Sequence, residues 1–213
     1  MLVRRLHGAM LAGTHPTRGG VAECEDLGSG LPSRAMSRVR QVRPDDLDAL
    51  LGMNNAAAPA VNALDADALA QLVDDSLWTG VVDGAEGPAG FLLGLHGPGL
   101  GYPSENYAWF SERFERFLYV DRVVVAQSAR GTGLGSLLYD AFASHGDVEG
   151  HPVLCAEVNV RPHNPGSLRF HESQGFVALG EQETKGGSVR VRMLAKAIGP
   201  LGHGPIAALA SPA

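Results

Sequence analysis

The chain has little of three things: cysteine, basic charge and long apolar runs. Cys24 and Cys155 are the two cysteines in 213 residues, which predicts neither a disulfide framework nor a metal site and favours a reducing cytoplasm. The 17 Lys and Arg residues are fewer than the 23 Asp and Glu residues, which argues against nucleic acid as a partner. No apolar run approaches the roughly 18 residues of a membrane span, so no membrane partner is expected.

Both ends of the chain lack sustained hydrophobic periodicity. Residues 1–36 are rich in Gly, Arg, Ser and Ala, without the apolar segment of a signal peptide, and predict a disordered leader. Whether translation starts at Met1 or at Met36 stays open. Residues 198–213 are rich in Gly, Pro and Ala and predict a flexible tail. One folded domain is therefore expected over residues 37–197.

Between the two ends, strand-like and helix-like patterns alternate. Strands are predicted at 37–43, 76–83, 89–96, 117–125, 152–160, 176–182 and 188–196, and helices at 44–57, 65–75, 133–145 and 164–174. Residues 97–116 are predicted to form a long loop that is first glycine-rich and then aromatic. The pattern indicates an α/β (α+β) domain with a central mixed, mostly antiparallel sheet of about seven strands and flanking helices.

The stretch "QSARGTGLGS", residues 127–136, lies where a strand gives way to a helix. The first amides of a helix lack internal partners and carry partial positive charge, and glycine lets the backbone approach an anion closely. Arg130 adds a cation beside them. The stretch therefore predicts a phosphate-binding turn. The alternative is a tight strand-to-helix turn that binds nothing.

Two other phosphate-binding motifs fit this stretch less well. A P-loop requires lysine where Ser136 follows Gly135, so that motif is excluded. The dinucleotide fingerprint is nearly met by Gly131, Gly133 and Ser136, and Glu157 could serve as its ribose-binding acid. However, only two strands and one helix follow the strand of Glu157, too few for a second nucleotide-binding half. A nucleotide-dependent oxidoreductase is therefore the weaker alternative.

Two motifs together resemble the GNAT acyltransferase superfamily. "RGTGLG", residues 130–135, resembles its coenzyme A-binding turn, and "EVNVRPHNPGSLRFHESQGF", residues 157–176, resembles its next strand, helix and Gly-Phe pair. The resemblance covers about residues 37–197. It implies a GNAT-like fold whose fourth and fifth strands are splayed for coenzyme A, and it implies acetyl-CoA as the co-substrate.

The resemblance also implies which residues contact coenzyme A. The strand before the turn would bind the pantetheine arm through its backbone, and the turn would bind the pyrophosphate. The helix after the next strand would contact the arm, although its first residue could equally be an N-cap. The cofactor-binding residues expected in this way are Val123, Val124, Val125, Arg130, Gly131, Thr132, Gly133, Leu134, Gly135, Ser136, Asn164 and Ser167.

One departure from the family concerns the acid that protonates the leaving thiolate. The family commonly has a tyrosine four residues before the Gly-Phe pair, where this chain has His171. An imidazolium can donate a proton near neutral pH, so His171 is a candidate acid. The alternatives are a surface histidine, or loss of the acid with transfer carried by positioning alone.

The general base that deprotonates the acceptor amine is expected to be a carboxylate. Asp121 is the first candidate, because many relatives place an acid at this point of the fourth strand, and Glu157 is the second. Strand alternation would put Asp121 on one side with Val123 and turn Arg122 the other way. A buried Asp paired to an arginine is the structural alternative.

The acceptor cavity is expected beside the first helix and the long aromatic loop. The candidate substrate-binding residues are Asn54, Asn55, Tyr107 and Trp109. Each also has a structural interpretation, as a helix cap for the asparagines and as core packing for the aromatics.

The sequence therefore predicts an enzyme that moves an acetyl group from acetyl-CoA to an amino group of a small molecule, protein or peptide. Direct attack is expected, because no Cys or Ser nucleophile with an adjacent base is visible. The alternative is a noncatalytic acyl-CoA-binding or sensing module on the same fold. The oligomeric state stays open, with a homodimer as one option.

Overall fold

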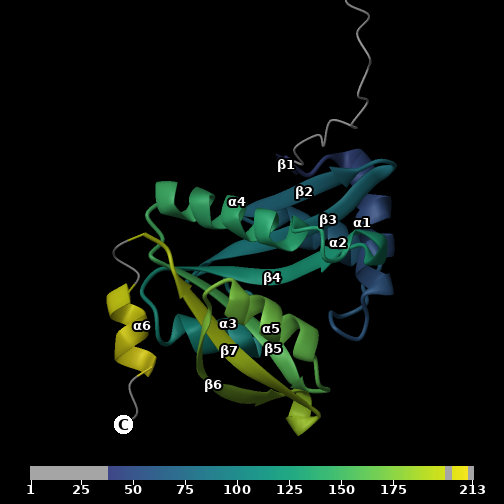
Figure 1. Ribbon diagram of the computed structural model, residues 1–213. Helices are drawn as coiled ribbons and strands as arrows, with labels where there is room; N and C mark the ends of the chain where they lie inside the picture. Colours follow the sequence, from purple (N-terminus) through teal and green to yellow (C-terminus); the bar gives the residue numbers. More distant parts are fainter. Residues whose placement is uncertain (1–37, 200–202, 211–213) are drawn as a thin grey trace, which may run out of the picture. The chain divides into compact units, whose positions relative to one another are not determined.

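The computed structural model of the chain describes residues 38–199 and 203–210 (Figure 1). The predicted leader over residues 1–36 lies outside them. Seven strands of the described chain form one mixed sheet in the order β1-β2-β3-β4-β5-β7-β6. The strands are β1 (Val39–Gln41), β2 (Trp78–Gly84), β3 (Gly87–Gly97), β4 (Phe117–Val125), β5 (Val153–Arg161), β6 (Val177–Thr184) and β7 (Val189–Ala197).

Within the described residues, six α-helices and three short 3-10 helices connect or follow these strands. The α-helices are α1 (Leu47–Ala56), α2 (Ala66–Asp74), α3 (Glu105–Ser111), α4 (Leu134–Val148), α5 (Pro165–Ser173) and α6 (His203–Ala210). The 3-10 helices are η1 (Pro44–Asp46), η2 (Gln127–Ala129) and η3 (Lys185–Gly187). No helix in the described part of the chain is long and apolar enough to cross a membrane.

Neighbouring strands are antiparallel except for β4 and β5, which are parallel and connected through α4. Each of these two strands has nine residues, and their pairing consists of Leu118 with Leu154 and Tyr119 with Cys155. Beyond these pairs the strands diverge, which leaves backbone groups on facing edges free of the sheet's ladder. The predicted mixed sheet with splayed fourth and fifth strands is confirmed.

Helices cover both faces of the sheet (Figure 1). Leu92 of β3 packs in an apolar cluster with Leu138 and Phe142 of α4, to which the α5 side chains also contribute. Leu93, the next residue of β3, packs in a second cluster with Phe110 of α3. Helices α1 and α2 pack against the same face as α3 through Leu50 and its neighbours. Alternating side chains of one strand therefore supply two separate cores.

A β-bulge in β4 changes which side chains share a face. Gly94 of β3 is opposite Val120, but the preceding β3 residue is opposite Arg122, so Asp121 is the extra residue. Val120 and Val123 consequently pack in the same cluster under α4. The prediction that Asp121 shares a side with Val123 is wrong, because the bulge interrupts the two-residue period of the strand.

Two segments contain helices that the sequence patterns do not predict. Helix α3 lies inside the predicted long loop at 97–116, where its seven residues are too few to show a helical period. Helix α6 lies inside the predicted tail at 198–213, where Ile198 and Ile206 are buried against the domain. These two isoleucines pack against the domain, but two isolated apolar residues in a Gly/Pro-rich segment do not predict a helix.

Gly94 is expected to be intolerant of a side chain, because it faces the ring of Phe142. A Cβ added there would lie 2.1 Å from Phe142 Cζ, so G94A should lower the free energy of unfolding by about 1–3 kcal/mol. G52A is the matched control, because a Cβ at this α1 position meets no atom within 4 Å and should stabilise by about 0.4–1 kcal/mol. Urea unfolding of both variants measures the difference, and equal midpoints would contradict the expectation.

Candidate active site

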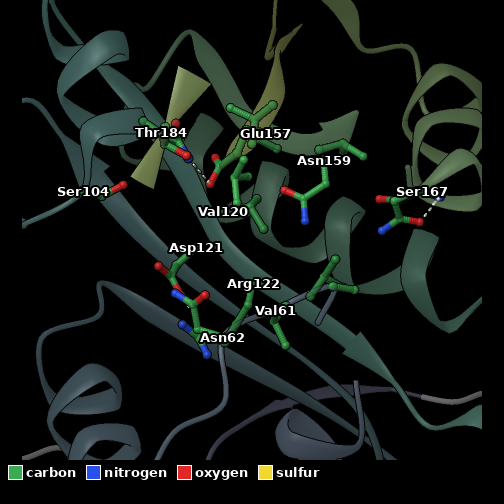
Figure 2. Close-up of a pocket in the computed structure, with 18 of the residues that line it drawn as sticks. Val61, Asn62, Ser104, Val120, Asp121, Arg122, Glu157, Asn159, Ser167 and Thr184 are labelled. Carbon is green, nitrogen blue, oxygen red and sulfur yellow. Dashed lines mark hydrogen bonds and ion pairs between the residues drawn. The ribbon is translucent and has the colours of Figure 1, made fainter. Parts of the chain in front are cut away.

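A cavity of about 690 Å³ lies where β4 and β5 diverge (Figure 2). Its wall combines the loop between α1 and α2, the start of α3, both diverging strands, α4, α5 and the β6–β7 hairpin. Polar and charged residues of the wall are Asn62, Tyr102, Ser104, Glu105, Asn106, Asp121, Arg122, Tyr139, Glu157, Asn159, Asn164, Ser167, His171, Thr184 and Lys185. Figure 2 shows Asp121, Glu157 and Ser167 around this cavity, from three different elements.

The cavity has two chemically different sides, one on each face of the sheet. On the face of α3, Glu157 of β5 accepts hydrogen bonds from Asn106 of α3 and from Tyr119 of β4. On the opposite face, Tyr139 of α4 lies against His171 of α5. The gap between the two strands therefore connects a carboxylate on one face with a hydroxyl–imidazole pair on the other.

Glu157 has the environment of a general base. Its Oε1 accepts from Asn106 Nδ2 at 3.0 Å and from Tyr119 Oη at 2.9 Å. Its Oε2 is buried and has no hydrogen-bond partner among the described residues. Burial raises the pKa of Glu157 to about 7, although the two hydrogen bonds oppose that rise. A carboxylate with this pKa and one unengaged oxygen can accept a proton near neutral pH.

Asp121, the first candidate from the sequence, has both oxygens engaged. Arg122 Nε donates to Oδ2 at 2.6 Å, and the Tyr102 hydroxyl donates to Oδ1. The two side chains of the ion pair are 8 % and 7 % exposed. The prediction that Arg122 points away from Asp121 is wrong: the bulge brings the guanidinium beside the preceding carboxylate. The arrangement matches the structural alternative of a buried Asp paired to an arginine.

His171 is 3 % exposed and is held at both ring nitrogens. Its Nδ1 lies 2.8 Å from the carbonyl oxygen of Ser167, and its Nε2 lies 2.7 Å from the hydroxyl of Tyr139. Burial lowers the pKa of His171, against the raising effect of the Ser167 carbonyl. The surface alternative for His171 is therefore excluded by its burial.

The glycine turn lies between η2 and α4. Gly131 and Gly133 have φ of 78° and 91°, values that favour glycine, and a Cβ at either would meet no atom within 4 Å. Gly133 directly precedes the 15-residue α4, so the helix's first amides open onto this unobstructed turn. Thr132 Oγ1 donates to the Ala129 carbonyl, a hydrogen bond within the turn that stabilises its conformation.

The family model described as the Acetyltransferase (GNAT) family matches residues 50–176. The chain belongs to the GNAT family. No curated protein sequence matches it.

Solved structures of similar fold include several N-acetyltransferases. The ribosomal-protein-S18-alanine N-acetyltransferase of Escherichia coli is 16 % identical with a TM-score of 0.58, covering 79 % of this chain and 98 % of its own. Naa20 of Chaetomium thermophilum, in complex with a bisubstrate analogue, is 20 % identical with a TM-score of 0.60, and the match covers 75 % of this chain and 86 % of the Naa20 chain. NAA60 of Arabidopsis thaliana, in complex with acetyl-CoA, is 15 % identical with a TM-score of 0.61, and the match covers 76 % of this chain and 99 % of the NAA60 chain. These structural similarities show that this chain has the same fold as the three acetyltransferases.

The second GNAT motif holds the α5 side of the cavity in place. Asn164 is the N-cap of α5, and its Oδ1 accepts from the Ser167 amide at 3.2 Å. Asn164, Ser167 and His171 all line the cavity, as expected of residues on one face of a helix. The N-cap interpretation of Asn164 is thus confirmed.

The four predicted substrate-binding residues support the cavity rather than line it. Asn54 donates to the Asn62 carbonyl at 2.9 Å, and Asn55 accepts from the Leu64 amide at 2.9 Å, so both hold the loop after α1. Tyr107 is buried and donates to a β3 carbonyl, and Trp109 packs beside Arg113. The described cavity wall includes none of the four. The packing alternative describes the two aromatics, whereas the two asparagines lie within α1 and bond the loop after it instead of capping the helix.

Tyr139 is one of several residues of the cavity wall that the sequence patterns do not predict. Tyr139 stands in the apolar periodic segment of the predicted helix at 133–145, where the period alone assigns it to the core. Its only sequence signal is a hydroxyl on an otherwise apolar helix face, and a buried tyrosine hydroxyl normally has a partner. That partner, His171, is 32 residues away in the sequence.

Proposed function

We propose that the protein transfers an acetyl group from acetyl-CoA to an amino group, by direct attack of the amine on the thioester. The observation that carries the proposal is Glu157: a buried carboxylate with an unengaged oxygen at the gap between β4 and β5. Membership of the GNAT family supports the transfer, and the acetyl-CoA complex of NAA60 supports the donor.

The donor is proposed to bind along the gap and the glycine turn. Residues 130–136 would hold the pyrophosphate, mainly through the exposed amides before α4, with Arg130 as an additional cation. Residues 123–125 would bind the pantetheine arm with backbone groups that β5 leaves unpaired. Asn164 and Ser167 would contact the arm from α5, where both already line the cavity.

Glu157 is proposed to act as the base, in preference to Asp121. An amine arrives protonated at neutral pH and must lose a proton before its nitrogen can attack. Glu157 can take that proton on Oε2, whereas both oxygens of Asp121 are already engaged by Arg122 and Tyr102. Cys155 is fully buried, and burial raises the pKa of its thiol, so a covalent cysteine intermediate is not proposed.

The acceptor is proposed to be the amino group of a small molecule or of a peptide or protein. The neighbours that act on protein amino groups, such as the ribosomal-protein-alanine N-acetyltransferase, support the second class. The cavity wall on the Glu157 side includes Asn62 and Tyr102, whose side chains would contact such a group.

Two measurements test the proposal. Coenzyme A and acetyl-CoA should raise the melting temperature while NAD(P)H should not, because a ligand that binds only the folded state stabilises it. Thiol release from acetyl-CoA with a panel of amines and N-terminal peptides should then show turnover. A shift with NAD(P)H alone would favour an oxidoreductase. Coenzyme A binding without turnover across the panel would favour the noncatalytic sensing module.

A further inference from the structure

Tyr139 and His171 form a buried pair on the cavity wall that the proposed function leaves unexplained. The Tyr139 hydroxyl lies 2.7 Å from His171 Nε2, and the two side chains are 1 % and 3 % exposed. The rings meet edge to face, with Phe170 and Phe176 packed around them. Both members of the pair line the cavity on the α4–α5 face, across the strand gap from Glu157.

The hydrogen bonds determine which atom of the pair carries a proton toward the cavity. The Ser167 carbonyl oxygen can only accept, so the proton of the neutral imidazole lies on Nδ1, 2.8 Å away. Nε2 is then an acceptor, and the Tyr139 hydroxyl donates to it. Because burial lowers the pKa of His171, the ring stays neutral at neutral pH. His171 therefore has no proton to give at Nε2.

The hydroxyl of Tyr139 remains as the donor of this pair. Burial raises the pKa of Tyr139 well above its ordinary value, so the hydroxyl keeps its proton throughout the working range of pH. A hydroxyl proton can also turn from one acceptor to another without any movement of the ring. His171 holds that proton in place when no second acceptor is present.

We infer that Tyr139 donates a hydrogen bond to the sulfur that leaves during acetyl transfer, and that His171 positions its hydroxyl. The inference rests on the proposed function. In that reaction the amine nitrogen bonds to the carbonyl carbon, the C–S bond breaks, and the electron pair stays on sulfur. Of the two protons that nitrogen loses, Glu157 takes the first and water the second, and water protonates the thiolate. Tyr139 stabilises the negative sulfur meanwhile and stays protonated.

Bound coenzyme A itself provides the test, because its thiolate can be titrated by ultraviolet absorbance without any turnover. Wild-type protein should lower the pKa of the bound thiol below that of free coenzyme A. Y139F should raise it again by about one unit, the size expected for one hydrogen bond to a charged group. The same variant should lower kcat about tenfold and leave KM for acetyl-CoA nearly unchanged.

Three further variants separate positioning from structure. H171F removes the acceptor and should reproduce the shift of the bound-thiol pKa, whereas H171Q keeps an acceptor and should restore most of the wild-type value. Y107F is the matched control, because it also removes a buried tyrosine hydroxyl, one bonded to the His96 carbonyl away from the cavity wall. It should leave the bound-thiol pKa unchanged.

The outcomes distinguish this inference from the proposed function. If wild-type protein binds coenzyme A and turns over but Y139F leaves the bound-thiol pKa and kcat unchanged, the inference is wrong and the proposed function stands. If S167A raises the bound-thiol pKa and Y139F does not, Ser167 is the donor, and the inference is again wrong. If wild-type protein neither binds coenzyme A nor releases its thiol from acetyl-CoA, both fail.

Discussion

Glutamine in place of Glu157 is expected to lower kcat for acetyl transfer by about 10²–10⁴-fold, the usual contribution of a general base. The amide keeps the shape of the side chain and can still accept from Asn106 and Tyr119, but it cannot take a proton on the atom that replaces Oε2. The affinity for coenzyme A should change little, because the glycine turn is untouched. Steady-state thiol release and calorimetric titration with coenzyme A measure the two quantities.

The pH profile identifies the base independently of the size of the rate loss. With a pKa of about 7, Glu157 should make kcat/KM of the wild type rise through neutral pH and then level off. E157Q should lose that rising limb. D121N provides the comparison, since Asp121 is already held by Arg122 and Tyr102. A limb that persists in E157Q and disappears in D121N would assign the base to Asp121.

A stability measurement shows whether lost activity reflects lost structure. The pKa of Glu157 is raised from 4.5 to about 7, so between these values the folded state binds more protons than the unfolded state. The free energy of unfolding contributed by this group therefore falls as the pH rises through that window. E157Q should be the more stable protein at pH 8, by on the order of 3 kcal/mol. Loss of activity in a variant of greater stability cannot be attributed to unfolding.

Local sequence patterns predict the fold well, because the elements that position the glycine turn are local. A buried strand, glycines with positive φ and a long apolar-faced helix follow one another within residues 117–148. The N-cap Asn164 and the stop at Gly175 bound α5 in the same local way. Helix α3 escapes prediction since its seven residues are stabilised mainly by packing of Tyr107 and Phe110 against the sheet.

The chemistry of the site is less predictable, because it depends on contacts between distant residues. Glu157 and Asp121 are both acids within largely apolar strands, and the resemblance to the family favours Asp121 as the base. The bulge in β4 places Asp121 in an ion pair with Arg122, whereas the buried Glu157 keeps one oxygen without a hydrogen-bond partner among the described residues. A bulge depends on the register between two strands, which hydrophobic alternation within either strand does not reveal.

R122M is expected to lower the free energy of unfolding by about 3–5 kcal/mol. Arg122 Nε holds Asp121 at 2.6 Å and its Nη1 donates to the Asn54 side chain at 2.8 Å, with the guanidinium almost fully buried. Its removal leaves an uncompensated buried carboxylate and an unpaired amide oxygen. Urea unfolding measures the loss.

Two further variants show whether the loss of stability in R122M comes from the unpaired charge of Asp121. R122M/D121N removes both charges and should recover a large part of the stability, which simple loss of packing would not allow. R190M is the matched control, because Arg190 of β7 also forms ion pairs with two carboxylates, Glu181 and Glu183 of β6, but all three side chains are exposed, so R190M should lose less stability. An equal loss in R122M and R190M would contradict the argument.

R122M should also weaken binding of the amine acceptor more than binding of the acetyl donor. Asn54, which Arg122 holds, in turn donates to the Asn62 carbonyl and so fixes the loop after α1 at the acceptor side of the cavity. In R122M the KM for the amine should therefore rise. The affinity for coenzyme A should be nearly retained, because its proposed contacts are the backbone of residues 123–125, the glycine turn and α5, and the substitution changes only the Arg122 side chain. Parallel losses of both affinities would instead indicate a general loosening of the strand gap.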